Sequence, residues 1–184
     1  MKYYLTSFFS GYSFRSKVEH DPDGDLAVIQ MKDLNHDFQE ISDDLTRISS
    51  EGIKEKYLLE KGDVIFIAKG ANNYAYVFDK PIKAVAASAF FVLRPDPAAV
   101  IPEYLAWYLN QETAQRYIEE NRAGTYIPNV NKAVLLNLDI KLPELTRQKL
   151  VAKIDELRMK EHKLILDILE RKDIVINKIL NDII

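Results

Sequence analysis

The sequence predicts a mixed α/β fold, in which an α+β globular domain is followed by one long C-terminal α-helix. Short apolar runs bounded by turn-forming residues occur throughout the first two thirds of the chain and are typical of strands. From Thr146 the apolar residues instead repeat about every 3.6 positions, and no Gly or Pro follows Pro143. We therefore expect a globular domain over residues 1–143 and a helix over residues 146–184.

Strands are expected where β-branched and aromatic residues cluster between turn signals. The segment Met1–Phe14 is typical of a strand or short helix that enters a turn at Ser10 and Gly11. Residues 33–52 are polar and lack a clean period, so they are expected to form a loop with at most one strand. Four clearer strands are predicted at Leu26–Met31, Val64–Ile67, Tyr74–Phe78 and Ala86–Leu93.

The remainder of the globular domain is expected to contain one helix and one closing strand. Proline is favoured at the start of a helix, so a helix is predicted from Pro102 to the vicinity of Gly124. The closing strand covers residues 135–143 and is indicated by alternating apolar residues, which place one side chain in two on a buried face. These alternating residues are Leu136, Leu138, Ile140 and Leu142.

The C-terminal helix carries an apolar stripe that its own domain cannot cover. At about 1.5 Å per residue, 39 residues extend about 58 Å, roughly twice the diameter of a small domain. A partner helix is therefore expected, and a tail folded back as a broken helical hairpin is the alternative. The residues predicted to form the dimer interface are Leu150, Ile154, Leu157, Leu164, Ile168 and Val175.

Composition limits the classes of protein to which the chain can belong. It has no cysteine, which excludes disulfides and thiolate metal sites, and no apolar run reaches the roughly 20 residues needed to cross a bilayer. We therefore expect a cytoplasmic protein with no membrane partner. The net charge of −3 gives no global sign of a nucleic-acid partner, but residues from Thr146 onward carry nine Lys/Arg against seven Asp/Glu. Any DNA binding must therefore use a local patch.

Catalytic and cofactor signatures are absent from the sequence. The three histidines are scattered, and no nucleotide-binding or methyltransferase motif occurs, so no catalytic residue, metal or cofactor is expected. The acidic turn Asp21–Asp25 lacks the distal glutamate of a calcium loop. One enzymatic alternative stays open: Asp23, Gln30 and Lys32 loosely imitate the Pro-Asp…(Asp/Glu)-x-Lys arrangement of a Mg²⁺-dependent nuclease.

Polar and basic residues follow several of the predicted strands. Lys and Arg can bind phosphates, while Asn and Arg suit base edges in the major groove of double-stranded DNA. The alternative is that these residues simply belong to solvated loops. The predicted DNA contacts are Arg15, Lys17, Lys32, Lys69, Asn72, Asn73, Arg122, Thr125 and Lys132.

Five segments, taken in order, resemble one half of a type I restriction-modification specificity subunit, and together they span nearly the whole chain. The resemblance departs from the family pattern at Glu144, where a second proline is usual, and at Arg147, where glutamate is common. The segments are SGYSFRSK (10–17), IQMKDL (29–34), LEKGDVIFIAKG (59–70), PEYLAWYLN (102–110) and the junction from Gly124 to Gln148.

The resemblance implies a target recognition domain joined to a spacer helix. Full subunits of this family carry two such halves, whose spacer helices pair antiparallel and hold the recognition domains apart on bipartite DNA. A chain with one half would act as a homodimer on a symmetric interrupted site. The resemblance also implies methyltransferase and restriction subunits as partners, with no chemistry performed by this chain. A third alternative is an assembly protein whose globular domain binds no nucleic acid.

Overall fold

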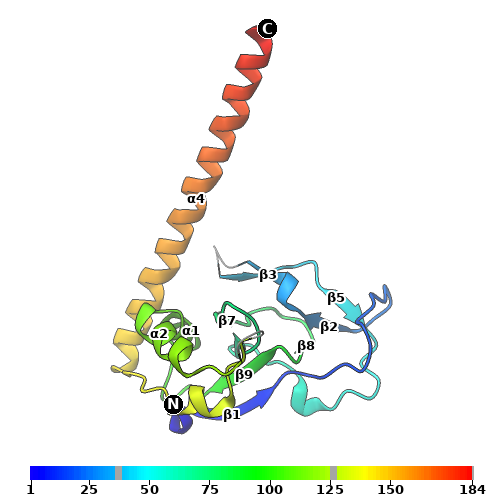
Figure 1. Ribbon diagram of the computed structural model, residues 1–184, viewed down its shortest axis with the longest axis vertical. Helices are drawn as coiled ribbons and strands as arrows, with labels where there is room; N and C mark the ends of the chain where they lie inside the picture. Colours follow the sequence, from blue (N-terminus) through cyan, green and yellow to red (C-terminus); the bar gives the residue numbers. More distant parts are fainter. Residues whose placement is uncertain (36–38, 125–127, 184) are drawn as a thin grey trace.

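The computed structural model describes residues 1–35, 39–124 and 128–183 (Figure 1). Its largest sheet is antiparallel, with strand order β1-β9-β6-β7. A second sheet has the order β5-β2-β8, in which β2 runs antiparallel to β5 and parallel to β8, and β3 pairs with β4. The strands are β1 Leu5–Ser10, β2 Leu26–Ile29, β3 Leu34–Asn35, β4 Glu40–Ile41, β5 Thr46–Ile48, β6 Val64–Ile67, β7 Ala75–Val77, β8 Ala84–Ala86 and β9 Phe90–Pro95.

Helices lie on one side of the large sheet and extend beyond it (Figure 1). Short 3-10 turns cover Lys2–Tyr4, Met31–Asp33 and Glu55–Tyr57. The α-helices are α1 Pro102–Leu109, α2 Glu112–Asn121, α3 Lys132–Asn137 and α4 Leu145–Ile183. The mixed fold and the long C-terminal helix predicted from the sequence are both confirmed.

Strand β6 lies at the centre of the globular part, and all four of its residues are buried. Val64 and Phe66 face the helices, whereas Ile65 and Ile67 face the three-stranded sheet. A strand covered on both faces requires apolar residues throughout rather than alternation, which explains the continuous run VIFI. This strand therefore ties the two layers of the core together.

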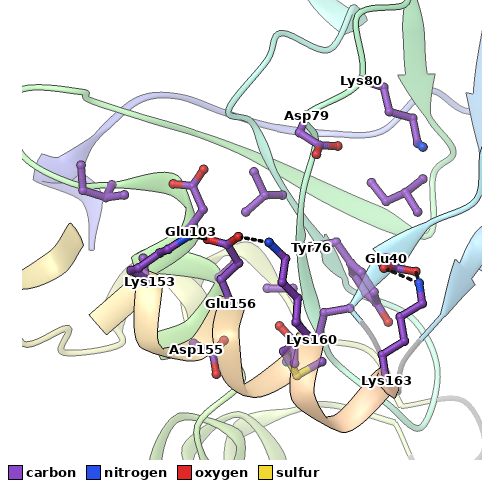
Figure 2. A pocket seen from close by; sticks show the side chains of 18 of the residues that line it. Glu40, Tyr76, Asp79, Lys80, Glu103, Lys153, Asp155, Glu156, Lys160 and Lys163 are labelled. Carbon is purple, nitrogen blue, oxygen red and sulfur yellow. Dashed lines mark hydrogen bonds and ion pairs between the residues drawn. The ribbon is translucent and has the colours of Figure 1, made fainter. Parts of the chain in front are cut away.

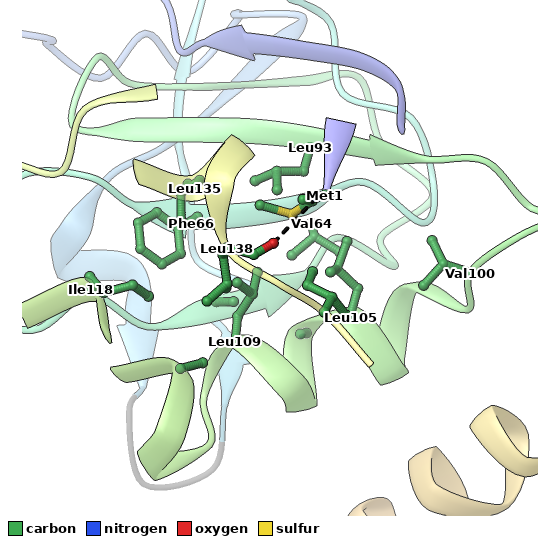
Figure 3. Packing of buried hydrophobic residues seen from close by; sticks show 14 of the residues in the cluster. Met1, Val64, Phe66, Leu93, Val100, Leu105, Leu109, Ile118, Leu135 and Leu138 are labelled. Carbon is green, nitrogen blue, oxygen red and sulfur yellow. Dashed lines mark hydrogen bonds between the residues drawn. The ribbon is translucent and has the colours of Figure 1, made fainter. Parts of the chain in front are cut away.

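The core on the helical side collects residues from segments far apart in the chain (Figure 3). Met1, Leu93, Leu105, Leu109 and Leu135 belong to one buried cluster. Burying such a side chain contributes about 1.5–3 kcal/mol each. One packed unit thus joins the first residue, strand β9, α1 and α3.

The predicted strand Ala86–Leu93 is two strands, β8 and β9, which belong to different sheets. The chain turns between them, and the turn lies against the end of β1, where a Cβ on Gly11 would be 2.1 Å from the oxygen of Ala87. Only glycine permits this approach. The Ser-Gly step at the end of the first strand therefore has a packing role.

The helix predicted from Pro102 to Gly124 is two helices, α1 and α2. The break falls at Asn110, whose side chain accepts a hydrogen bond from the Ala75 amide (2.7 Å) and donates one to the Ala75 carbonyl (2.9 Å). Asn110 thus satisfies backbone groups at the edge of β7 in the way a neighbouring strand would. Local helical periodicity could not show this long-range contact.

The closing strand predicted over residues 135–143 is wrong, and its predicted buried face is correct only in part: Leu136 and Leu142 are half-buried, while Leu135, predicted off that face, is buried. Asn131 caps α3 by accepting a hydrogen bond from the Val134 amide, and helix rather than strand extends to Asn137. The segment beyond is held by tyrosines of α1: Tyr104 donates to the Lys141 carbonyl (2.6 Å) and Tyr108 to the Asp139 carbonyl (3.1 Å). Leu138 and Ile140 are buried as the alternation predicted.

The Gly-Asp step before β6 is a structural element. Gly62 has a φ of 93°, which favours glycine. Asp63 is buried and pairs bidentately with Arg94, with Nε–Oδ1 at 2.8 Å and Nη2–Oδ2 at 2.9 Å. These hydrogen bonds raise the pKa of Arg94. The Gly-Asp step therefore stabilises the fold.

Helix α4 leaves the globular part and continues far beyond it (Figure 1). It begins at Leu145, one residue before the predicted start. Gln148 is its single buried residue. Nowhere in the described part of the chain is a helix both long enough and apolar enough to cross a bilayer.

Candidate nucleic-acid interface

Ends of strands from both sheets meet at one edge of the globular part, which we call the loop edge. It comprises Gly11–Tyr12, Gln30–Lys32, Ala68–Asn72, Ala87–Ala89 and Pro128–Val130. Backbone hydrogen bonds link these segments in series: Tyr12 donates to Ala86, Ala87 to Ile29, Ala68 to Ala89, and Val130 to Ala68. Polar residues that are far apart in the sequence are thereby brought to one surface.

The loop between β6 and β7, residues 68–74, is held by hydrogen bonds from several other segments. The Gly70 amide donates to the Pro128 carbonyl (3.0 Å), and the backbones of Lys69 and Asn129 pair in an isolated antiparallel β-bridge. Arg122 Nη1 donates to the Ala71 carbonyl (3.0 Å), and Asn73 Nδ2 donates to the Ile67 carbonyl (2.9 Å). The loop thus has a defined conformation although its tip is exposed.

Five of the predicted DNA contacts lie on neighbouring segments of the loop edge or directly beside it: Lys32, Lys69, Asn72, Arg122 and Lys132. The side chains of Lys69 and Asn72 are exposed and have no hydrogen-bonding partner among the described residues. Lys32 Nζ is 3.0 Å from Thr46 Oγ1. Lys132 donates to the Phe8 carbonyl and lies over the Phe8 ring, and it remains exposed.

Arg15 and Lys17 lie on a different part of the surface. Both are exposed, on the segment that follows Tyr12. Phe14 and Val18 from this segment pack on the outer face of the three-stranded sheet, and the segment leads away from the loop edge. The structure therefore does not gather Arg15 and Lys17 with Lys69.

Two predicted contacts have internal roles instead. Asn73 is only 3% exposed, and its amide is used inside the β6–β7 loop. The side chain of Arg122 is 23% exposed and is also paired with Glu119 at 3.2 Å. We therefore exclude Asn73 as a direct DNA contact. Thr125 lies outside the described residues.

The geometry gives no support to the nuclease alternative. Asp23 precedes β2 and Gln30 follows it, so a four-residue strand, about 13 Å long, separates them. Gln30 and Lys32 are both hydrogen-bonded to Thr46 Oγ1. No cluster of three His, Cys, Asp or Glu side chains suited to a metal occurs within residues 1–35, 39–124 and 128–183.

Asp33, next to Lys32, is a buried carboxyl whose role is local. Its Oδ2 accepts a hydrogen bond from the Gln30 amide (2.7 Å) at the start of the 3-10 turn Met31–Asp33. Burial raises the pKa of Asp33 in spite of this hydrogen bond. The carboxyl holds the turn that carries Lys32.

The two faces of α4 differ in chemistry. The face toward the globular part carries Gln148, Val151, Asp155, Met159 and Lys163 at helical spacing, and its members are buried or half-buried. The opposite face carries the predicted dimer stripe, whose six side chains are each between 53% and 61% exposed. Within the described residues, the stripe is therefore left uncovered by the chain itself.

A groove of about 830 Å³ lies between the N-terminal half of α4 and the globular part (Figure 2). Ion pairs line it: Lys163 reaches Glu40 on β4 at 2.9 Å, and Glu156 lies between Lys153 and Lys160. Hydrogen bonds from these two lysines lower the pKa of Glu156 to about 2. Such exposed pairs add little to stability, because water and salt screen them.

Gln148 attaches α4 to the globular part, and sequence reasoning gave it no physical role. Its Oε1 accepts from the Ile101 amide (2.9 Å), and its Nε2 donates to the carbonyls of Ala99 (3.1 Å) and Pro143 (2.8 Å). Gln115 was also missed; it donates to the Asn73 carbonyl at 2.9 Å. Local periodicity does not reveal either role, because Ile101 and Ala99 for Gln148, and Asn73 for Gln115, are distant in the chain.

Comparison with known proteins gives consistent results. The family model for the type I restriction modification DNA specificity domain matches residues 5–184. The chain is 30% identical over 102 residues to the type I restriction enzyme HindI specificity subunit of Haemophilus influenzae, a match that covers 52% of this chain and 22% of that protein.

Solved structures show the same fold. The HsdS subunit from Thermoanaerobacter tengcongensis aligns with a TM-score of 0.64 and 17% identity, over 79% of this chain and 38% of that one. A chain from a structure of type I R-M complex assembly aligns with a TM-score of 0.69 and 15% identity, over 94% and 40%. The chain thus spans well under half the length of these relatives. It belongs to the type I restriction modification DNA specificity domain family.

Proposed function

We propose that the chain is a sequence-specific DNA-recognition subunit of a type I restriction-modification system, and that it acts as a half subunit. In this proposal residues 1–143 form the target recognition domain and residues 146–184 the spacer helix. The observation that carries the proposal is the loop edge, where exposed Lys69 and Asn72 lie on a braced loop beside Lys32 and Lys132. Family membership supports DNA recognition by the chain, and the proposal assigns that role to this surface.

The chemistry of these side chains suits DNA rather than a small molecule. Lysines bind phosphates and set the register, whereas an asparagine amide can pair with the edge of a base in the major groove. Arg15 and Lys17 would reach the backbone further along the duplex. Because the net charge is −3, we expect weak binding by the isolated chain and tighter binding within a complex.

The uncovered stripe of α4 supports self-association through this helix. An antiparallel pairing related by a two-fold axis would place the two globular parts at opposite ends of the helix pair, suited to a symmetric interrupted site. The remaining exposed area of each stripe residue would then be buried in both copies, which favours pairing. A single stripe on each helix is sufficient for one such partner.

The distal half of α4 supports further partners. Beyond Lys163 exposed apolar side chains spread around the helix, including Leu166, Leu169 and Ile174, which lie off the stripe. One partner helix covers only a narrow seam, so a second is needed for the remainder. In the proposal the methyltransferase subunits supply it, a restriction subunit joins the complex, and this chain performs no catalysis.

Methylation mapping tests the proposal. The chain is combined with its methyltransferase subunits and S-adenosylmethionine, and modified positions are located on genomic DNA. We expect methylation at a single interrupted sequence, lost when Lys69 and Asn72 are both replaced by Ala. Lys54→Ala is the matched control, since Lys54 is exposed and lies outside the loop edge. Unchanged methylation in the double variant would favour an assembly protein that binds no DNA.

A further inference from the structure

The β6–β7 loop is held on both sides of its exposed tip. Before the tip, the Ala71 carbonyl accepts from Arg122 at 3.0 Å. After it, the side chain of Asn73 is buried on the Ile67 carbonyl, and the Asn73 carbonyl accepts from Gln115 at 2.9 Å. Asn72 lies between these two anchored residues and is exposed.

Arg122 is poorly suited to bind a phosphate itself. Its side chain is only 23% exposed, and its two terminal nitrogens are used internally, one on Ala71 and the other on Glu119 at 3.2 Å. Glu119 also neutralises much of the charge that a phosphate would need. The guanidinium instead joins the end of α2 to the β6–β7 loop, because its planar fork can serve two acceptors at once.

We propose that Arg122, together with Gln115, is a positioning residue that holds the β6–β7 loop so that Asn72 reads one base pair in each half of the DNA site. The inference rests on the proposed function and adds to it the residue that reads a base and the residues that orient it. An asparagine amide discriminates bases only when both its donor and its acceptor meet the base edge, so its orientation must be fixed before binding.

A positioning role and a direct phosphate contact predict different effects on DNA binding when the residue is replaced. Loss of a phosphate contact weakens binding to all sequences and lowers the salt dependence of log K by about 0.9 per contact. Loss of a positioning residue lowers discrimination at one base pair and leaves the salt dependence unchanged. Lys69, which is exposed on the same loop, supplies the phosphate-type comparison.

The test measures binding of the full chain, in complex with its methyltransferase subunits, to the target site and to all single-base variants between 50 and 200 mM salt. For Arg122→Ala we expect about tenfold weaker binding to the target, an unchanged salt slope, and lost preference at the same base pair as Asn72→Ala. Gln115→Ala should lose preference at that position too, and Arg122→Lys should not restore it. Combining Arg122→Ala with Asn72→Ala should add no further loss of preference there.

Three results would overturn the proposal. A salt slope that falls in Arg122→Ala as it does in Lys69→Ala, with base preference intact, would make Arg122 a phosphate contact. Preference unchanged in both Arg122→Ala and Gln115→Ala would refute the positioning role while leaving the proposed function standing. Wild-type protein that binds all sequences equally would refute the proposed function, and the positioning role with it. Fluorescence of Trp107, the single tryptophan, checks that each variant is folded.

Discussion

Replacing Gln148 with alanine should destabilise the attachment of α4 more than any exposed substitution nearby. Gln148 is 1% exposed and makes three hydrogen bonds, to Ile101, Ala99 and Pro143. Each such bond contributes about 0.5–1.5 kcal/mol, and a buried group left without a partner costs about 1–3 kcal/mol. Because Ala also favours helix slightly, we expect a net loss of about 3 kcal/mol.

The assay is urea unfolding followed by Trp107 fluorescence, since Trp107 lies on α1, which Ile101 precedes directly. With a slope of about 2 kcal/mol per molar urea, the midpoint should fall by about 1.5 M. Protein concentration is kept equal throughout, because association through α4 would stabilise the folded state. The matched control is Lys149→Ala, an exposed neighbour, which should change stability by less than about 0.5 kcal/mol.

Gln148→Glu gives a second, sharper comparison. Glutamate keeps the shape but turns the donor that faces two carbonyls into an acceptor, so the ionised form should be at least as destabilising as alanine. Protonation restores one donor, and the variant should therefore recover stability as the pH falls. If Gln148→Ala unfolds within 0.5 kcal/mol of wild type, the hydrogen bonds of Gln148 do not hold α4 and the reasoning is refuted.

Three further substitutions test other parts of the structure. Asp63→Ala removes the buried carboxylate that pairs with Arg94, while Glu60 and the Leu58 carbonyl still hold the guanidinium, and should cost about 1.5–3 kcal/mol in urea unfolding; a loss below 1 kcal/mol would contradict the assigned role. Leu157→Glu with Ile168→Glu should weaken self-association at least ~100-fold in sedimentation equilibrium, and an unchanged dimer would exclude the stripe as the interface. Burial raises the pKa of Asp33 above its ordinary 3.8, so the folded state binds that proton more tightly than the unfolded state, and stability falls as pH rises from 3.8 through the raised value; the stability of Asp33→Asn relative to wild type should therefore increase with pH over that range, and a difference that does not change with pH would contradict the shift.

The sequence was most informative where local pattern alone determines structure. The buried run Val64–Ile67 and the helical period after Thr146 were identified because burial on two faces and amphipathic helix each leave a direct periodic signal. The segment 135–143 shows the limit of this reasoning. Alternation correctly indicated that Leu138 and Ile140 are buried, but it could not show that tyrosine hydroxyls rather than a neighbouring strand satisfy the backbone.

The candidate site was harder to predict for the same physical reason. In residue type and in placement on loops, Asn73 resembles Asn72 and Arg122 resembles Lys69. What separates them is whether a main-chain acceptor lies within reach. The Ile67 carbonyl serves Asn73 within the same loop, and the Ala71 carbonyl serves Arg122 from a distant segment. The segments that carry the family resemblance also prove to be largely scaffold: Gly11, Asp63, Asn110 and Gln148 hold elements together, as their contacts show.

Selection of bound sequences from a random DNA library by the chain in complex with its methyltransferase subunits tests the central claim most directly. Recognition by two copies joined through α4 predicts that the enriched sequences contain two inverted half-sites separated by a spacer of constant length. Enrichment of a single unpaired half-site would contradict pairing of two copies, and no enrichment at all would contradict DNA recognition by this chain.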